Sequence, residues 1–187
     1  MNNRRTAASI RRSYTGARSR AEGEGFEHII DSACAYYRSI GLADIEKTPE
    51  PMRPIGSPDR AGRFLACYTK QAQPDYKGIL KGGRAVNFEA KHTDSDRLTF
   101  DRVLTAQALR LSSTEALGGV AFVLCSFSGR AFYRVPWAVW KDMKRLFGRK
   151  YITPSDIEIY RVPFAVPGVL LFLAGVKEKN DDPNMDT

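Results

Sequence analysis

The apolar pattern first becomes regular over residues 25–41, where it predicts a helix. Apolar side chains recur there at spacings of three and four, at Phe26, Ile29, Ile30, Ala33, Cys34 and Tyr37. This spacing places them on one face, so the helix is expected to pack against a core. The chain is then rich in Pro, Gly and Asp over 48–62, which predicts a loop. It alternates over 64–70, which predicts an extended strand or ribbon.

A β-hairpin is predicted next. Two strand-like runs, 76–80 and 85–92, are joined by Lys81-Gly82-Gly83-Arg84. Adjacent glycines favour a tight turn because glycine accepts positive φ without a Cβ clash. The two strands should therefore lie side by side.

The second half of the chain predicts two more helices and a strand pair. A helix is expected over 100–117, closed by Gly118-Gly119, and the most apolar run, 120–127, is expected to be a central strand that pairs with 131–135. Pro136 then opens a helix that carries Trp137 and Trp140, and one or two strands fall within 157–173. This order predicts an α/β fold with a mixed central β-sheet flanked by helices.

Length and composition are those of one globular domain. The chain has 187 residues, 43% hydrophobic, which supplies enough apolar material for one core and excludes wholesale disorder. The longest apolar stretch, 162–176, is interrupted by prolines and glycines, so no membrane span is predicted. No apolar signal-type segment follows the first arginines, and the three scattered cysteines indicate reduced thiols. We therefore expect a cytoplasmic protein.

The charge is uneven along the chain. Its formal net value is +8, which indicates an acidic partner. Residues 1–20 contain six arginines and no acid, so we expect 1–22 to be a flexible basic arm. This arm either neutralises nucleic-acid phosphates or only keeps the chain soluble. Residues 23–176 form the expected domain, which is mildly basic, and 177–187 form an acidic tail.

Three charged residues of the predicted hairpin form the candidate chemical site. Asp75 begins one strand, and Glu89-Ala90-Lys91 ends the other. Because side chains alternate along a strand, Glu89 and Lys91 share a face, and the hairpin brings Asp75 alongside them. Carboxylates are the oxygen ligands that Mg²⁺ prefers, and a neighbouring lysine offsets charge that develops on a phosphate. The pattern indicates metal-dependent cleavage of a phosphodiester.

The pattern alone leaves a second interpretation open. Acid-x-Lys triplets arise by chance in a chain of this length, and this sequence has others at 75–77 and 142–144. A surface charge pair on an ordinary hairpin therefore fits these residues too. The triplet at 89–91 is favoured because it ends an extended run and has a partner acid across the turn.

A longer series of segments, in order over about residues 23–147, carries a resemblance to a known family. The segments are Gly25-Phe26-Glu27, Pro74-Asp75-Tyr76-Lys77-Gly78-Ile79, Gly83-Arg84, Phe88-Glu89-Ala90-Lys91 with Thr93, Gln107, Gly118-Gly119, Ala121-Phe122-Val123-Leu124, and Tyr133 with Val135-Pro136 and Trp140. They resemble RecU, the Holliday junction resolvases of Gram-positive bacteria and their phages.

The resemblance implies a restriction-endonuclease-like fold with a projecting β stalk. It also implies a homodimer that uses Mg²⁺, for which Mn²⁺ substitutes. The implied substrate is a four-way DNA junction, cut by symmetric paired nicks, and a strand-exchange recombinase is an implied partner. Two alternatives stay open: a related nuclease that acts on flaps or linear duplex, and a DNA-binding regulator of recombination without nuclease activity.

The resemblance also assigns roles to individual residues. Asp75 and Glu89 match metal ligands, Gln107 matches a further ligand from the following helix, and Lys91 matches the stabiliser of the transition state. The family has a threonine ligand two positions before the Asp, where this chain has Gln73, whose amide also offers an oxygen to a metal. Glu27 matches an acid of the first helix near the catalytic site, and it fits equally well an acid near a helix N-terminus that the macrodipole favours.

Four basic residues are expected to meet DNA. The implied stalk covers about 60–74 and contains Arg60, Arg63 and Lys70, and Arg84 lies in the hairpin turn. An ordinary edge ribbon fits 60–74 equally well.

Overall fold

A computed structural model describes residues 7–49, 52–68, 73–165 and 168–176, with the side chains of 7–22 left aside. Lys70 of the predicted stalk, residues 1–6 of the predicted arm and the predicted acidic tail lie outside the described residues.

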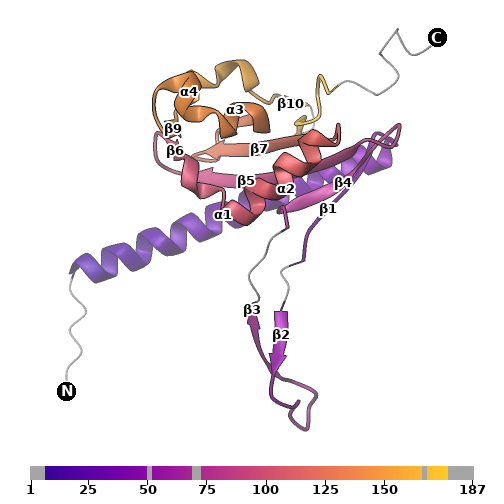
Figure 1. The fold of residues 1–187 in the computed structure, drawn as a ribbon. Coiled ribbons are helices and arrows are strands. Elements are labelled where there is room, and N and C mark those ends of the chain that lie inside the picture. Colours follow the sequence, from indigo (N-terminus) through magenta and orange to yellow (C-terminus); the bar gives the residue numbers. More distant parts are fainter. Residues whose placement is uncertain (1–6, 50–51, 69–72, 166–167, 177–187) are drawn as a thin grey trace.

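A five-stranded mixed sheet forms the centre of the molecule, in the order β1-β4-β5-β7-β8 (Figure 1). Strands β5 and β7 are parallel, and the other neighbours are antiparallel. The strands are β1 (Ala43–Lys47), β4 (Tyr76–Leu80), β5 (Ala85–Thr93), β7 (Val120–Phe127) and β8 (Ala131–Pro136). This arrangement confirms the predicted fold class, a mixed central sheet flanked by helices.

Each face of the sheet has its own apolar core. Helix α1 (Ala7–Ser39) and the segment with β10 (Phe164–Ala165) and β11 (Val169–Leu170) cover one face, where Phe88 and Phe122 stack at 4.6 Å between ring centroids. The other face carries α2 (Thr105–Ala116), α3 (Trp137–Lys141) and α4 (Met143–Phe147) around Trp140. Short elements complete this side: β6 (Leu98–Thr99) paired with β9 (Tyr151–Ile152), and the 3₁₀ turns Phe100–Arg102, Pro154–Asp156 and Glu158–Tyr160.

The β4–β5 hairpin is confirmed, with Tyr76 opposite Phe88 and Ile79 opposite Ala85. Its turn needs glycine, because Gly82 and Gly83 have φ of 84° and 86°. Gly78 is required for another reason. A Cβ there would lie 2.1 Å from the carbonyl oxygen of Asp44, so only glycine lets β1 pair this closely with β4.

Helix α1 begins at Ala7 instead of near Gly25, which corrects the prediction at this end. It includes residues 7–22, most of the segment expected to be a flexible arm, so secondary structure does not break at residue 22. The only large apolar residues of 7–22 are Ile10 and Tyr14, so this segment shows no amphipathic spacing. Its many Ala and Arg residues nevertheless have high intrinsic helix propensity.

A two-stranded ribbon projects from the sheet (Figure 1). It pairs β2 (Met52–Ile55) with β3 (Leu65–Tyr68). The predicted strand over 64–70 is therefore present, but the loop expected over 48–62 contains the partner strand, and β1 was not predicted. The projecting element begins before residue 60, which corrects the predicted stalk boundary.

Two further findings concern the described residues. None of their helices combines the length and the apolarity that a bilayer span requires. All three cysteines are free thiols: Cys34 and Cys125 are buried, and Cys67 on the ribbon is partly exposed.

Candidate active site

The hairpin brings Asp75, Glu89 and Lys91 together at the end of β4. Asp75 directly precedes β4, and the first residue of that strand, Tyr76, lies opposite Phe88 of β5. Strand β5 continues to Thr93, and within the described residues no strand pairs with this extension on the β4 side. Glu89 and Lys91 lie on one face of this extension, as the alternation of side chains predicts.

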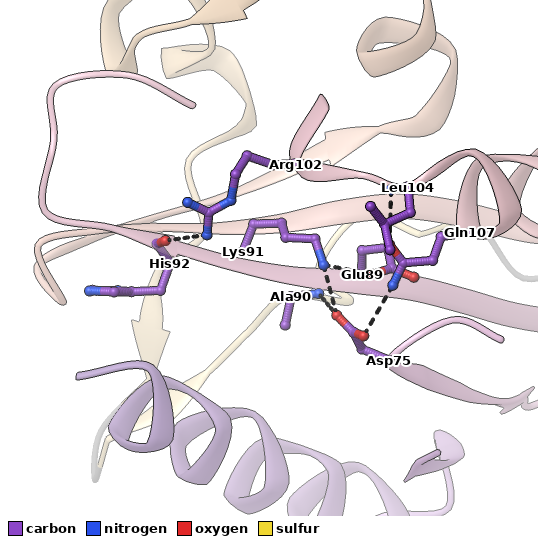
Figure 2. A network of polar contacts seen from close by, with 8 residues as sticks. All are labelled: Asp75, Glu89, Ala90, Lys91, His92, Arg102, Leu104 and Gln107. Atoms are coloured by element: carbon purple, nitrogen blue, oxygen red, sulfur yellow. Dashed lines mark hydrogen bonds and ion pairs between the residues drawn. The ribbon is translucent and has the colours of Figure 1, made fainter. Parts of the chain in front are cut away.

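The three side chains form one polar cluster (Figure 2). Lys91 Nζ donates to Glu89 Oε2 at 2.8 Å and to Asp75 Oδ2 at 3.2 Å. Asp75 Oδ2 also accepts from the backbone N–H of Ala90 at 3.0 Å. The backbone of β5 and the ammonium group thus fix the orientation of the Asp75 carboxylate.

Burial makes this cluster unlike a surface ion pair. The side chain of Glu89 is fully buried, that of Lys91 is 12% exposed and that of Asp75 is 28% exposed. Buried charges are costly unless they are paired or hold a metal. The interpretation as an exposed charge pair on a hairpin is therefore wrong.

The pKa values reflect this crowding. Burial raises the pKa of Glu89 to about 8, and the Asp75 carboxylate adds to the rise, while Lys91 opposes it. Burial alone would lower the pKa of Lys91, but the carboxylates of Asp75 and Glu89 outweigh it and raise this pKa. Two acids thus share one cation, and further positive charge would stabilise the cluster.

The donor set fits a hard divalent cation. Glu89 Oε1 is buried and has no hydrogen-bond partner within the described residues, which is the state expected of an oxygen that a cation would ligate. Within the same ranges, no three His, Cys, Asp or Glu side chains lie close enough to share a metal. Among the described residues, Asp75 and Glu89 are therefore the two carboxylates of this cluster that could hold a cation.

Gln107, the predicted further ligand, reaches the cluster from α2. Its Nε2 lies 3.5 Å from Asp75 Oδ1, and its Oε1 accepts from the backbone N–H of Leu104 at 3.0 Å, at the start of the helix. The amide nitrogen therefore faces Asp75. Ligation by Gln107 requires the amide to turn and give up the bond to Leu104.

Two other predicted residues do not join the cluster. Gln73 is exposed, and its Oε1 accepts from Lys77 Nζ at 3.0 Å. Glu27 on α1 forms an ion pair with Lys47 at 2.6 Å, and it lines a cleft that also contains Ala90. Glu27 thus lies beside the candidate active site without touching its carboxylates.

The residues predicted to contact DNA lie in two places. Arg60 and Arg63 are exposed at the tip of the ribbon, where Asp59 accepts from the backbone N–H of Arg63 at 2.9 Å and pairs with its guanidinium at 3.1 Å. Arg84 lies at the other end of β5 and donates to the carbonyl oxygen of Gly118 at 2.8 Å. The structure does not bring Arg84 near the tip.

One basic residue beside the cluster was not predicted from the sequence. Arg102 ends the turn before α2, and its Nη2 donates to the backbone oxygen of His92 at 3.1 Å (Figure 2). A lone arginine in a short turn belongs to no motif, and only the fold places it next to Lys91 along β5.

Comparisons with known proteins agree with one another on a family. The family model described as "Recombination protein U", or RecU, matches residues 21–178. The Holliday junction resolvase RecU of Lactococcus lactis subsp. lactis is 35% identical over 111 residues, which cover 57% of this chain and 52% of that protein. The RecU of Streptococcus sanguinis is 32% identical over 120 residues, covering 61% and 60%.

Two further matches are more distant. The RecU of Bacillus pumilus is 27% identical over 158 residues, which cover 76% of each protein. A solved structure, that of Archaeoglobus fulgidus Hjc, a Holliday junction resolvase from an archaeal hyperthermophile, has a TM-score of 0.45 at 13% identity, covering 80% of this chain and 96% of that one. The matched part of the chain spans about half the length of the Lactococcus lactis RecU.

Proposed function

This chain belongs to the RecU family, and from that premise we propose that it is a Mg²⁺-dependent endonuclease that resolves four-way DNA junctions. The observation that carries the proposal is the buried cluster of Asp75, Glu89 and Lys91. A protein that only binds DNA has no need to hold two carboxylates, one of them fully buried, against one lysine. The relatives named as Holliday junction resolvases supply the substrate class.

Asp75, Glu89 and a neutral oxygen would hold the Mg²⁺ ion. When bound, the ion supplies Lewis-acid activation at the phosphate and stabilises the leaving oxygen. The protein fixes the two carboxylates beforehand, through the Ala90 N–H on Asp75 and through the buried position of Glu89. Little reorganisation is then needed when the substrate arrives.

Lys91 is the proposed stabiliser of the transition state. Its ammonium group has three donors, and within the described residues two of them go to the carboxylates. With so little exposure, the ammonium group acts where water does not screen it strongly. It is thus suited to balance negative charge that accumulates on phosphate oxygens.

The proposed assembly is a homodimer on the junction. A two-fold protein matches a two-fold junction, so each protomer would nick one of two opposing strands. The ribbon of β2 and β3 would enter the open centre of the junction. Phe64 and Leu65 of this ribbon are 54% and 78% exposed, so they are available to contact unstacked bases there. A strand-exchange recombinase is a proposed partner on the same grounds of family membership.

The test is a gel of an end-labelled four-way junction and of a linear duplex of matched sequence, each with and without Mg²⁺. The proposal predicts paired nicks in the junction with Mg²⁺, no cutting without it, and little cutting of the duplex. Equal cutting of both substrates would favour a nuclease of other specificity. Junction binding without any cutting, across a titration of divalent metals, would favour a regulator.

A further inference from the structure

A cleft of about 390 Å³ lies beside the catalytic cluster, between α1 and the edge of β5. Its walls include Glu24 and Phe26 from α1, His92 and Asp94 from the end of β5, and Arg102. Its size is that of a small-ligand site and exceeds what a single ion needs. Nothing in the proposed ligand set uses it.

The cleft adjoins the candidate active site at Ala90, whose side chain points away from Glu89 and Lys91 across the edge of β5. Ala90 lines the cleft, and the N–H of the same residue holds the Asp75 carboxylate. His92 follows Lys91 directly in β5. A DNA strand with one phosphate at Asp75 and Lys91 that continues along β5 toward His92 would therefore reach the cleft with its neighbouring nucleotide.

The charges of the cleft are unevenly compensated. Glu27 is paired with Lys47 at 2.6 Å, and Asp94 lies 3.4 Å from His92 Nε2. Arg102 is different, because among the described residues its guanidinium bonds only a backbone carbonyl. Glu24 likewise has no cationic partner in that part of the chain. One wall thus offers an uncompensated cation, and another offers an uncompensated carboxylate.

The inner surface of the cleft is aromatic. Phe26 is 3% exposed, and the side chain of His92 is 7% exposed. Their ring centroids lie 6.5 Å apart. Little of either ring is exposed, so the two rings form an apolar floor of the cleft against which the edge of a nucleobase can pack.

We propose that this cleft binds the nucleotide next to the scissile phosphate. In this arrangement Arg102 holds the phosphate of that nucleotide, and Glu24 accepts a hydrogen bond from an exocyclic amino group of its base. A nucleotide fits because it carries both an anion and amino donors, which match the two uncompensated groups. The inference rests on the proposed function and adds a base preference to it, since thymine has no amino group.

The first test replaces Arg102 by alanine in the full chain. Affinity for a fluorescent four-way junction is measured with Ca²⁺ in place of Mg²⁺, over a series of salt concentrations. The logarithm of the association constant falls linearly with the logarithm of the salt concentration. Loss of one phosphate contact should make this slope less steep by about 1. Junction cleavage should fall at least about tenfold, as expected for a charged hydrogen bond. Lys144→Ala, which removes an exposed charge on α4, is the matched control and should change neither quantity.

The second test replaces Glu24 by glutamine. Cleavage is measured on four junctions that differ only in the base next to the cut. The wild type should cut the dT junction more slowly than the dA, dC and dG junctions, and Glu24→Gln should narrow this difference. Equal rates on all four wild-type reactions, or an unchanged preference in Glu24→Gln, would overturn the base contact.

The two proposals fail in different ways. If the wild type does not cut junctions, the proposed function is wrong, and the salt slope of Arg102→Ala still reports on the cleft. If the wild type cuts junctions and Arg102→Ala binds and cuts them as Lys144→Ala does, the proposal of a nucleotide site in the cleft is wrong. The nuclease assignment then stands.

Discussion

Two hairpins that follow one another in the chain differ in which side chains they expose to water. The β4–β5 hairpin is part of the central sheet and places Glu89 and Lys91 where water hardly reaches them. The β2–β3 ribbon exposes apolar side chains instead, with Ile55 at 52% and Leu65 at 78%. Each departs from the ordinary distribution, in which charges are solvated and large apolar groups are covered.

The contrast separates two tasks. Buried charge is useful where a developing charge must be met by fixed groups, and its cost is borne by a sheet with cores on both faces. An exposed apolar ribbon contributes little to folding, and such surfaces commonly mark interaction sites. We therefore assign chemistry to the β4–β5 hairpin and recognition of the junction to the β2–β3 ribbon.

The largest expected effect comes from Lys91. Lys91→Ala should reduce junction cleavage by about 10²- to 10³-fold, because it removes a fixed charge from the transition state. Junction affinity in Ca²⁺ should change little. Lys77→Ala is the control, since Lys77 belongs to the acid-x-Lys triplet at 75–77 but is exposed on β4. Cleavage by Lys91→Ala at the wild-type rate would remove the chemical role of this hairpin.

The next effect concerns stability. Phe88 is fully buried and stacks on Tyr76 at 4.8 Å and on Phe122 at 4.6 Å. Phe88→Ala should lower the free energy of unfolding by about 3–5 kcal/mol. Leu65→Ala on the ribbon should change it by less than about 0.5 kcal/mol. Urea denaturation measures both values, and similar losses would show that the ribbon is part of the folded core.

A smaller effect is expected from the exposed ribbon. The double change Phe64→Ser with Leu65→Ser should weaken binding to a four-way junction by about tenfold, through lost contact with unstacked bases. Binding to linear duplex should be unaffected. The pair Leu109→Ser with Leu117→Ser, at positions 67% and 86% exposed at α2, serves as control. Equal effects of the two pairs on junction binding would deny the ribbon a special role.

The smallest effect is a thermal shift. At ten times its dissociation constant, Mg²⁺ should raise the Tm of the wild type by about 3 °C without DNA. Glu89→Gln should abolish this shift, because the buried carboxylate is a proposed ligand. Glu46→Gln, a change at an exposed acid of β1, should keep it. A shift of the same size in Glu89→Gln would exclude Glu89 from the metal site.

The sequence predicted those parts of the fold that local patterns encode. The Gly82-Gly83 turn and the alternation around Ala90 were enough to place Glu89 and Lys91 on one face. The resemblance to RecU predicted Gln107 as a metal ligand, and its Nε2 lies 3.5 Å from Asp75 Oδ1, while its role as a ligand stays a prediction. These features depend on short-range geometry or on a recognised motif.

The parts that were missed depend on tertiary context. Strand β2 contains Pro54 and lies in a Pro- and Gly-rich region, and only its pairing with β3 makes it a strand. Gln73 was expected near the metal, but Lys77, four residues on, binds its side chain instead. Arg102 acquires its place only when the turn before α2 folds back onto β5.

The most direct test of the central claim is single-turnover cleavage of a labelled four-way junction by the wild type and by Asp75→Asn, with Mg²⁺ and with the junction saturated by protein. The substitution keeps the size of the side chain and removes the charge that the proposed metal requires. If Asp75 holds the catalytic metal, we expect two symmetric nicks by the wild type and none by Asp75→Asn, with junction affinity in Ca²⁺ nearly unchanged. Nicks by Asp75→Asn at the wild-type positions and rate would contradict it.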